Sequence, residues 1–193
     1  MKRSIARACF LAGLICASGC AGAMPRAYVG GALSPGMRVA VFPLANYTEQ
    51  QDASDRIVPL LMVEAARQRN LEIIDPGMIE ALLAREPWLL LDRLPPDLVD
   101  RFGAELQADA ILIGSVLALG YRDADVAAVP ELSLALRLLK IPGGECLWSG
   151  AHSRSGNDRE SLFGLGRIDN LERLATGVVQ ELVATLPSVV EAP

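Results

Sequence analysis

Few residues in this chain could perform catalysis, and none of them stands in a recognised catalytic pattern. The chain has one histidine, His152, so a metal centre built on several histidines is impossible. A serine nucleophile would also need His152, but Ser153 and Ser155 do not stand in a Gly-x-Ser-x-Gly turn. We interpret His152 as a polar residue at a strand end, and a hydrolase centred on it is the alternative hypothesis.

Two other patterns are weak candidates for chemistry. Asp123 and Asp125 could serve as an acid–base pair, but aspartates are also ordinary turn residues. Residues 164–166 read Gly-Leu-Gly and follow no strand of the dinucleotide-binding kind, which argues against phosphate binding. The sequence therefore predicts no enzyme, no catalytic residue, no bound metal and no cofactor.

The cysteine with a predicted chemical role is Cys20. It follows a basic segment (Lys2, Arg3 and Arg7), an apolar run at 8–15 and small residues at 17–19. This is the pattern of a secretory signal peptide, and the apolar run is shorter than the ~20 residues that a membrane-spanning helix needs. Its end resembles a bacterial lipobox, in which the cysteine is lipidated and becomes the mature N-terminus. We predict a signal peptide at 1–19 and lipidation of Cys20, with an ordinary cleaved signal as the alternative.

The composition of the remaining chain excludes several partner classes. Three of the 18 basic residues precede Cys20, so 15 remain against 23 acidic ones, a formal net charge of about −8. Such a chain is repelled by nucleic acid and by anionic lipid. Once Cys9 and Cys16 leave with the signal, Cys146 has no partner for an internal disulfide, and we predict that it packs as a small apolar residue.

Hydrophobic periodicity predicts one domain over residues 38–187. Gly, Ala and Pro dominate the preceding segment, so 20–37 reads as the lipidated cysteine and a short flexible linker, and 188–193 as a C-terminal tail. The predicted order is β-α-β-α-α-β-β-β-α. Its strands are expected at 38–44, 71–74, 110–117, 131–138 and 145–153, and its helices at 55–69, after Asp75, at 96–107 and from a capping box of Asp169 and Glu172 onward. The fold class is α/β (α+β), with a single mixed sheet of about five strands and helices packed on it.

Two loops are candidates for contact with a partner. Residues 120–130 carry Tyr121, and the polar, glycine-rich segment 154–168 carries Leu162, Phe163 and Leu165. Exposed apolar groups in a polar loop are typical of a binding site. The alternative for the second loop is that Phe163 folds back under the last helix.

Four segments of the domain resemble the bacterial envelope lipoproteins of the CsgG/LpoB-like group. Residues 71–75 (LEIID) resemble the second strand of these proteins, and 136–149, with Gly-Glu at 144–145 and Leu-Trp-Ser at 147–149, resemble their closing hairpin. The other two segments resemble their opening strand with its Asn-Thr turn and their third strand: 38–48 (RVAVFPLANYT) and 108–116 (ADAILIGSV). The fold of that group is similar to the N-terminal domain of TolB.

The resemblance implies a non-catalytic role at the outer membrane. Some members activate peptidoglycan synthases by direct contact, and others form rings, including a curli secretion channel. The connection at 119–130 is too short and too charged for the membrane strands of a channel. The linker is also shorter than the tether of the synthase activator. The resemblance supplies no catalytic residue.

We expect a lipid-anchored lipoprotein of the outer membrane whose domain faces the periplasm and binds another envelope protein. A cell-wall (peptidoglycan) synthase and a secretion or surface-assembly complex are the expected partner classes. A self-assembling, ring-forming component of an export complex is the alternative.

Overall fold

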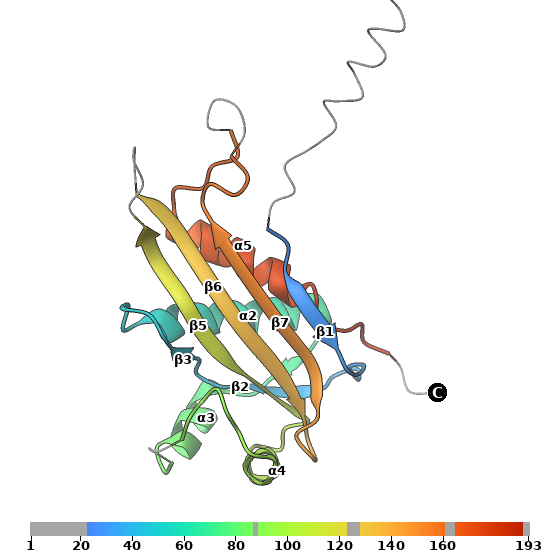
Figure 1. Ribbon diagram of the computed structural model, residues 1–193. Coiled ribbons are helices and arrows are strands. Elements are labelled where there is room, and N and C mark those ends of the chain that lie inside the picture. Colours follow the sequence, from blue (N-terminus) through green and yellow to red (C-terminus); the bar gives the residue numbers. More distant parts are fainter. Residues whose placement is uncertain (1–22, 87–88, 123–127, 161–164, 191–193) are drawn as a thin grey trace, which may run out of the picture.

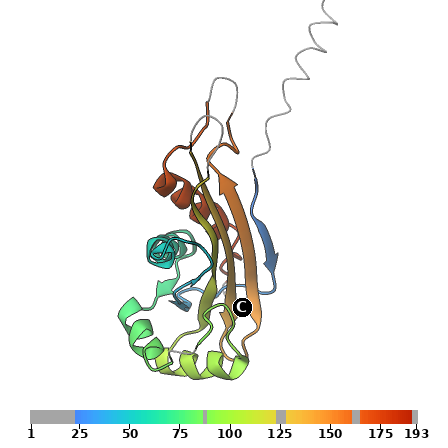
Figure 2. The same cartoon turned by 60° about the vertical axis from the view of Figure 1, so that its left-hand side comes forward.

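The protein is built around one mixed β-sheet with helices on both faces (Figures 1 and 2). The computed structural model describes residues 23–86, 89–122, 128–160 and 165–190. The strands run in the order β1 (Arg26–Val29), β7 (Cys146–Ser155), β6 (Val129–Lys140), β5 (Ala110–Arg122), β2 (Arg38–Val41) and β4 (Glu72–Ile73), and the short β3 (Ala45–Asn46) also pairs with β5. The helices are α2 (Ala53–Arg69), α3 (Pro76–Leu83), α4 (Pro96–Leu106) and α5 (Leu171–Val183).

The predicted fold class is confirmed. From residue 38 onward the elements follow the predicted order, with β3 as an addition. The sheet has seven strands where about five were expected, and β1 and β3 account for the difference. None of the helices in the described ranges is long and apolar enough to cross a membrane.

The alternating pattern of β6 explains the larger of two hydrophobic layers. Its even-numbered leucines from 132 to 138 are buried and face the same side as Trp148 of β7. Helices α2 and α5 cover this side (Figure 2), and α5 contributes the stripe of Leu174, Val178 and Leu182. A strand with one apolar side and a helix with one apolar stripe can bury both surfaces only by packing together.

The second layer lies on the opposite face and covers only part of the sheet. Ile111 and Ile113 of β5 pack there with Phe42 and Phe102, whose ring centroids are 6.0 Å apart. Helices α3 and α4 build this layer at the end of the sheet where β5 begins (Figures 1 and 2). Farther along β6 and β7 the same face carries the small side chains of Ser133, Ala135, Ala151 and Ser153, over which no described helix lies.

The helix starts test two predicted caps. The side chain of Asp75 accepts a hydrogen bond from the backbone N–H of Gly77 at 2.8 Å, and Pro76 follows it, so this predicted cap is confirmed. The predicted capping box of the last helix is wrong. Its N-cap is Asn170, which accepts from the N–H of Arg173, whereas Asp169 pairs with Arg167.

The flexible linker expected at 20–37 is wrong for the part that the structure describes. Arg26–Val29 forms β1, which pairs with β7 from Arg26↔Ala151 to Val29↔Trp148. Leu33 is 1% exposed and forms a bridge with Val189, so the expected C-terminal tail is also attached to the domain. The segment joins the sheet because β7 would otherwise leave an unpaired backbone edge.

Replacement of Leu33 tests whether this segment belongs to the folded domain. We expect Leu33→Ala to lower the free energy of unfolding by about 2–5 kcal/mol, because it leaves a cavity in the core. Met24→Ala is the matched control, since Met24 is 80% exposed in the same segment and its loss should change stability by less than ~0.5 kcal/mol. Urea denaturation measures the free energy of unfolding of both variants. An effect of Leu33→Ala as small as that of Met24→Ala would mean that the segment is a linker.

Candidate functional site

The predicted contact residues that the structure describes lie at one end of the sheet. Tyr121 and Leu165 are 54% and 67% exposed. Tyr121 lies on β5 and not in a loop as expected, because β5 and β6 continue to pair as far as Arg122↔Val129. Leu165 lies in the connection from β7 to α5, and the backbone N–H of Leu171 at the start of α5 donates to the Tyr121 hydroxyl at 3.3 Å. Cys20, Leu162 and Phe163 lie outside the described residues.

The structure differs from the sequence interpretation of His152. This residue lies within β7, not at a strand end, and is 3% exposed, and no serine hydroxyl of the described ranges is bonded to it. Cys146 is a free, half-buried thiol that donates to the carbonyl of Trp148. No group of three or more His, Cys, Asp or Glu side chains in the described ranges could hold a metal ion.

A network of charged and polar side chains joins β7 to α5. The sequence analysis did not predict this network. The carboxylate of Glu181 accepts from Nε2 of His152 at 2.7 Å, from Arg154 at 3.0 Å and from Arg159 at 2.7 Å. An ionised carboxylate only accepts, so Nε2 carries the proton of the imidazole. The Nδ1 atom of His152 and Nε of Arg154 are buried without a partner among the described residues.

Opposing effects determine the acidity of Glu181. Burial raises the pKa of its carboxyl, but the hydrogen bond from His152 and the charges of Arg154 and Arg159 outweigh burial and bring the pKa below its ordinary value. The ionised form is therefore the one that holds β7 and α5 together. The network can thus position α5 against β7.

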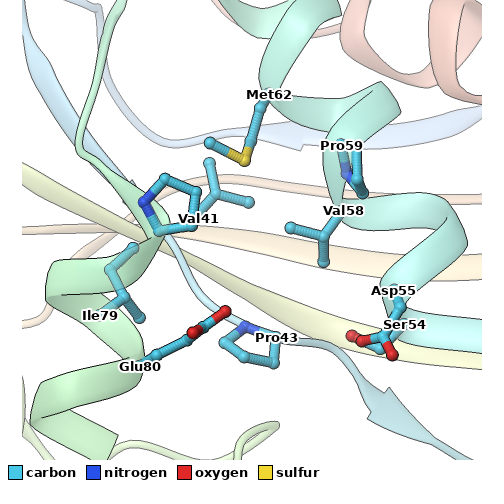
Figure 3. A pocket seen from close by; sticks show the side chains of 10 residues that line it. Val41, Pro43, Ser54, Asp55, Val58, Pro59, Met62, Ile79 and Glu80 are labelled. Carbon is cyan, nitrogen blue, oxygen red and sulfur yellow. The ribbon is translucent and has the colours of Figure 1, made fainter. Parts of the chain in front are cut away.

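A candidate ligand site is a mostly apolar hollow between α2 and α3 (Figure 3). Its volume is about 250 Å³. The wall is mostly apolar and includes three prolines, and its lining residues come from the end of β2, from α2 and from the start of α3: Val41, Pro43, Ser54, Asp55, Val58, Pro59, Met62, Pro76, Ile79 and Glu80. The Ser54 hydroxyl accepts from the backbone N–H of Leu44 at 2.9 Å and so fixes the segment after β2 against α2.

The charged groups at the rim of this hollow are two carboxylates, which are negatively charged hydrogen-bond acceptors. Asp55 and Glu80 stand on its two helices, and neither side chain forms a hydrogen bond or an ion pair with a described residue. Pro59 also has no N–H to donate to the carbonyl of Asp55 one turn earlier in α2. Ligand pockets usually enclose roughly 300–1,000 Å³. The hollow is smaller than this range, so its volume suits one side chain of a partner. The two rim carboxylates suit a cation beside that side chain.

Comparisons with solved structures define the class of the fold. PelC from Paraburkholderia phytofirmans, solved as a dodecamer, is 20% identical with a TM-score of 0.61 over 86% of this chain and 99% of that chain. Lipoprotein GNA1162 from Neisseria meningitidis is 20% identical with a TM-score of 0.52 over 75% of this chain and 96% of that one. The LpoB C-terminal domain from Salmonella enterica is 16% identical with a TM-score of 0.46 over 65% of this chain and 87% of that one.

These likenesses show that the chain has a fold also found in a bacterial lipoprotein and in the dodecameric PelC. No protein-family model and no curated protein matches the chain. The likeness to lipoprotein GNA1162 supports a fold found among lipoproteins, whereas the CsgG-like part of the expected resemblance is not shown and its functional part remains a prediction.

Removal of the Glu181 charge tests the buried network. We expect Glu181→Gln to lower the free energy of unfolding at neutral pH by about 1–3 kcal/mol, because it leaves Arg154 buried without a counter-charge. Glu49→Gln is the matched control, since Glu49 is exposed and its side chain has no described partner, and it should have almost no effect.

The pH dependence of this difference has a definite sign. The folded-state pKa of Glu181 lies below the ordinary value of 4.5, so its stabilisation is present above that value and is lost as the pH falls through the folded pKa. The stability gap between the wild type and Glu181→Gln should therefore narrow on acidification, as urea denaturation at several pH values would measure. A gap that widens in acid would contradict the assignment.

Proposed function

We propose that this chain is a lipid-anchored protein of the bacterial envelope that binds another envelope protein through the hollow between α2 and α3. Acylation of Cys20 would anchor it to the outer membrane, with the domain in the periplasm. The fold shared with lipoprotein GNA1162 is consistent with this place.

Two features of the hollow carry the proposal together: its volume and the negative charge at its rim. A space of about 250 Å³ with an apolar wall accommodates one aliphatic or aromatic side chain. The unpaired carboxylates of Asp55 and Glu80 at the rim favour a lysine or arginine next to that side chain. The expected partner therefore presents an apolar anchor flanked by a basic residue.

A second candidate function is self-assembly. PelC, which shares the fold over 99% of its chain, is described as a dodecamer. A head-to-tail contact between identical subunits closes into a ring when the rotation between them permits it. In that case the apolar anchor would come from a second copy of this chain.

Site-specific photo-crosslinking in the cell tests the proposal and separates the two candidates. A photoreactive amino acid at Met62 lines the hollow, whereas the same group at Val63, 62% exposed on the next position of α2, is the matched control. We expect Met62, and not Val63, to capture one envelope protein. Capture of a second copy only would favour self-assembly, and equal capture at both positions would contradict a role for the hollow.

Reversal of the rim charge gives a quantitative prediction. Glu80→Lys should lower the yield of the Met62 crosslink about tenfold, which corresponds to ~1.4 kcal/mol of binding free energy, because it repels the basic residue of the partner. Glu145→Lys changes the net charge equally at an exposed position away from the hollow and should leave the yield unchanged. An unchanged yield with Glu80→Lys would mean that the partner brings no cation to the rim.

A further inference from the structure

The chain that leads to Cys20 is held against the sheet almost up to the proposed anchor. Ala23, Met24 and Arg26 line a hollow of about 360 Å³ on the face that carries no helix. The other wall of this hollow includes Leu117 of β5 and Ser153 of β7. Three peptide units remain between Ala23 and Cys20, and they reach at most ~11 Å.

This short reach defines which end of the domain can approach the anchor. Ser153 is two residues from the end of β7, a distance of about 7 Å along the strand. The start of β7 at Cys146 is seven residues from Ser153, about 23 Å in the opposite direction, and α4 lies at that far end (Figure 1). Cys20 can therefore reach the level at which β7 ends, but not the end that carries α3 and α4.

The end within reach of Cys20, which we name the hairpin end, consists of residues 120–122, 128–130, 156–160 and 165–170. Figure 1 places the end of β5, the start of β6 and the connection from β7 to α5 there. Tyr121 and Leu165 expose apolar surface at this end, whereas the exposed Arg122 and Arg159 are paired with the carboxylates of Glu131 and Glu181. A tyrosine with an amphipathic ring is typical of the boundary between lipid and water.

We propose that the hairpin end rests on the lipid surface that holds the acylated Cys20, with Tyr121 and Leu165 at the level of the lipid headgroups. The inference rests on the proposed lipid anchor and adds the orientation of the domain. The α3–α4 end then points away from the bilayer. Val41, which lines the hollow between α2 and α3, pairs with Leu112, ten residues or about 33 Å along β5 from Arg122. The partner would therefore be bound about 30 Å from the membrane.

Fluorescence quenching in vesicles tests the orientation. The full-length acylated protein, with Cys146→Ser to remove the free thiol, is reconstituted into vesicles of phosphatidylethanolamine and phosphatidylglycerol that contain headgroup spin-labelled lipid. Single variants Tyr121→Cys, Leu165→Cys and Met78→Cys carry an environment-sensitive dye, and Met78, 48% exposed on α3, is the control at the far end. We expect several-fold stronger quenching at positions 121 and 165 than at position 78.

The outcomes separate this inference from the lipid anchor. Quenching at position 78 equal to or stronger than at 121 and 165, or no quenching at any position of the bound protein, would overturn the orientation. The two labels at the hairpin end guard against a local effect of either substitution. Cys20→Ser should release the protein from the vesicles, and if it stays bound as well as the wild type, the anchor itself is wrong and the orientation falls with it.

Discussion

The burial of the first half of β5 on both of its faces is the constraint on which the rest of the structure depends. Ala110 and Leu112 point into the layer under α2 and α5, whereas Ile111 and Ile113 point into the layer under α3 and α4. Four consecutive residues thus join the two layers, and β2 and β6 flank them on either side. Because α3 and α4 pack only around this segment, the second half of the hairpin is covered by α5 on one face and leaves part of the other sheet face open.

The charged groups that the fold buries serve to position α5. Desolvation of Arg154 and Glu181 costs free energy that their attraction only partly returns, so such a network is weak evidence for stability. It does determine how α5 can lie, since only one position of the helix brings Glu181 to His152 and both arginines. Arg69 acts similarly from α2, donating to the backbone carbonyl of Leu186 just beyond α5. The helices are thereby fixed by polar contacts as well as by the apolar stripe.

The sequence predicts the elements whose hydrophobic pattern is regular and misses those that depend on neighbours. The leucines of β6 and the stripe of α5 carry their own periodicity, which is why their order and type were predictable. All four residues of β1 are exposed, so only its backbone pairing with β7 makes it a strand. The His152 network could have been found, because alternation along β7 places His152 and Arg154 on the same face as Trp148. The hollow could not, because its concavity arises from the relative placement of two helices.

The negative net charge of the chain and the short tether between β1 and Cys20 together explain why a lipid would be needed to hold this domain at a membrane. The chain after Cys20 carries a formal net charge of about −8, so anionic lipid repels it over a distance of roughly 8 Å at physiological ionic strength. Tyr121 and Leu165 offer too little apolar surface to overcome that repulsion, whereas each buried methylene of an acyl chain contributes ~0.8 kcal/mol. Since β1 holds the tether against the sheet, the acyl chain would not only attach the domain but also determine its orientation. A partner that fills the hollow between α2 and α3 would then have to meet the domain at a fixed height, which a long flexible linker would not impose.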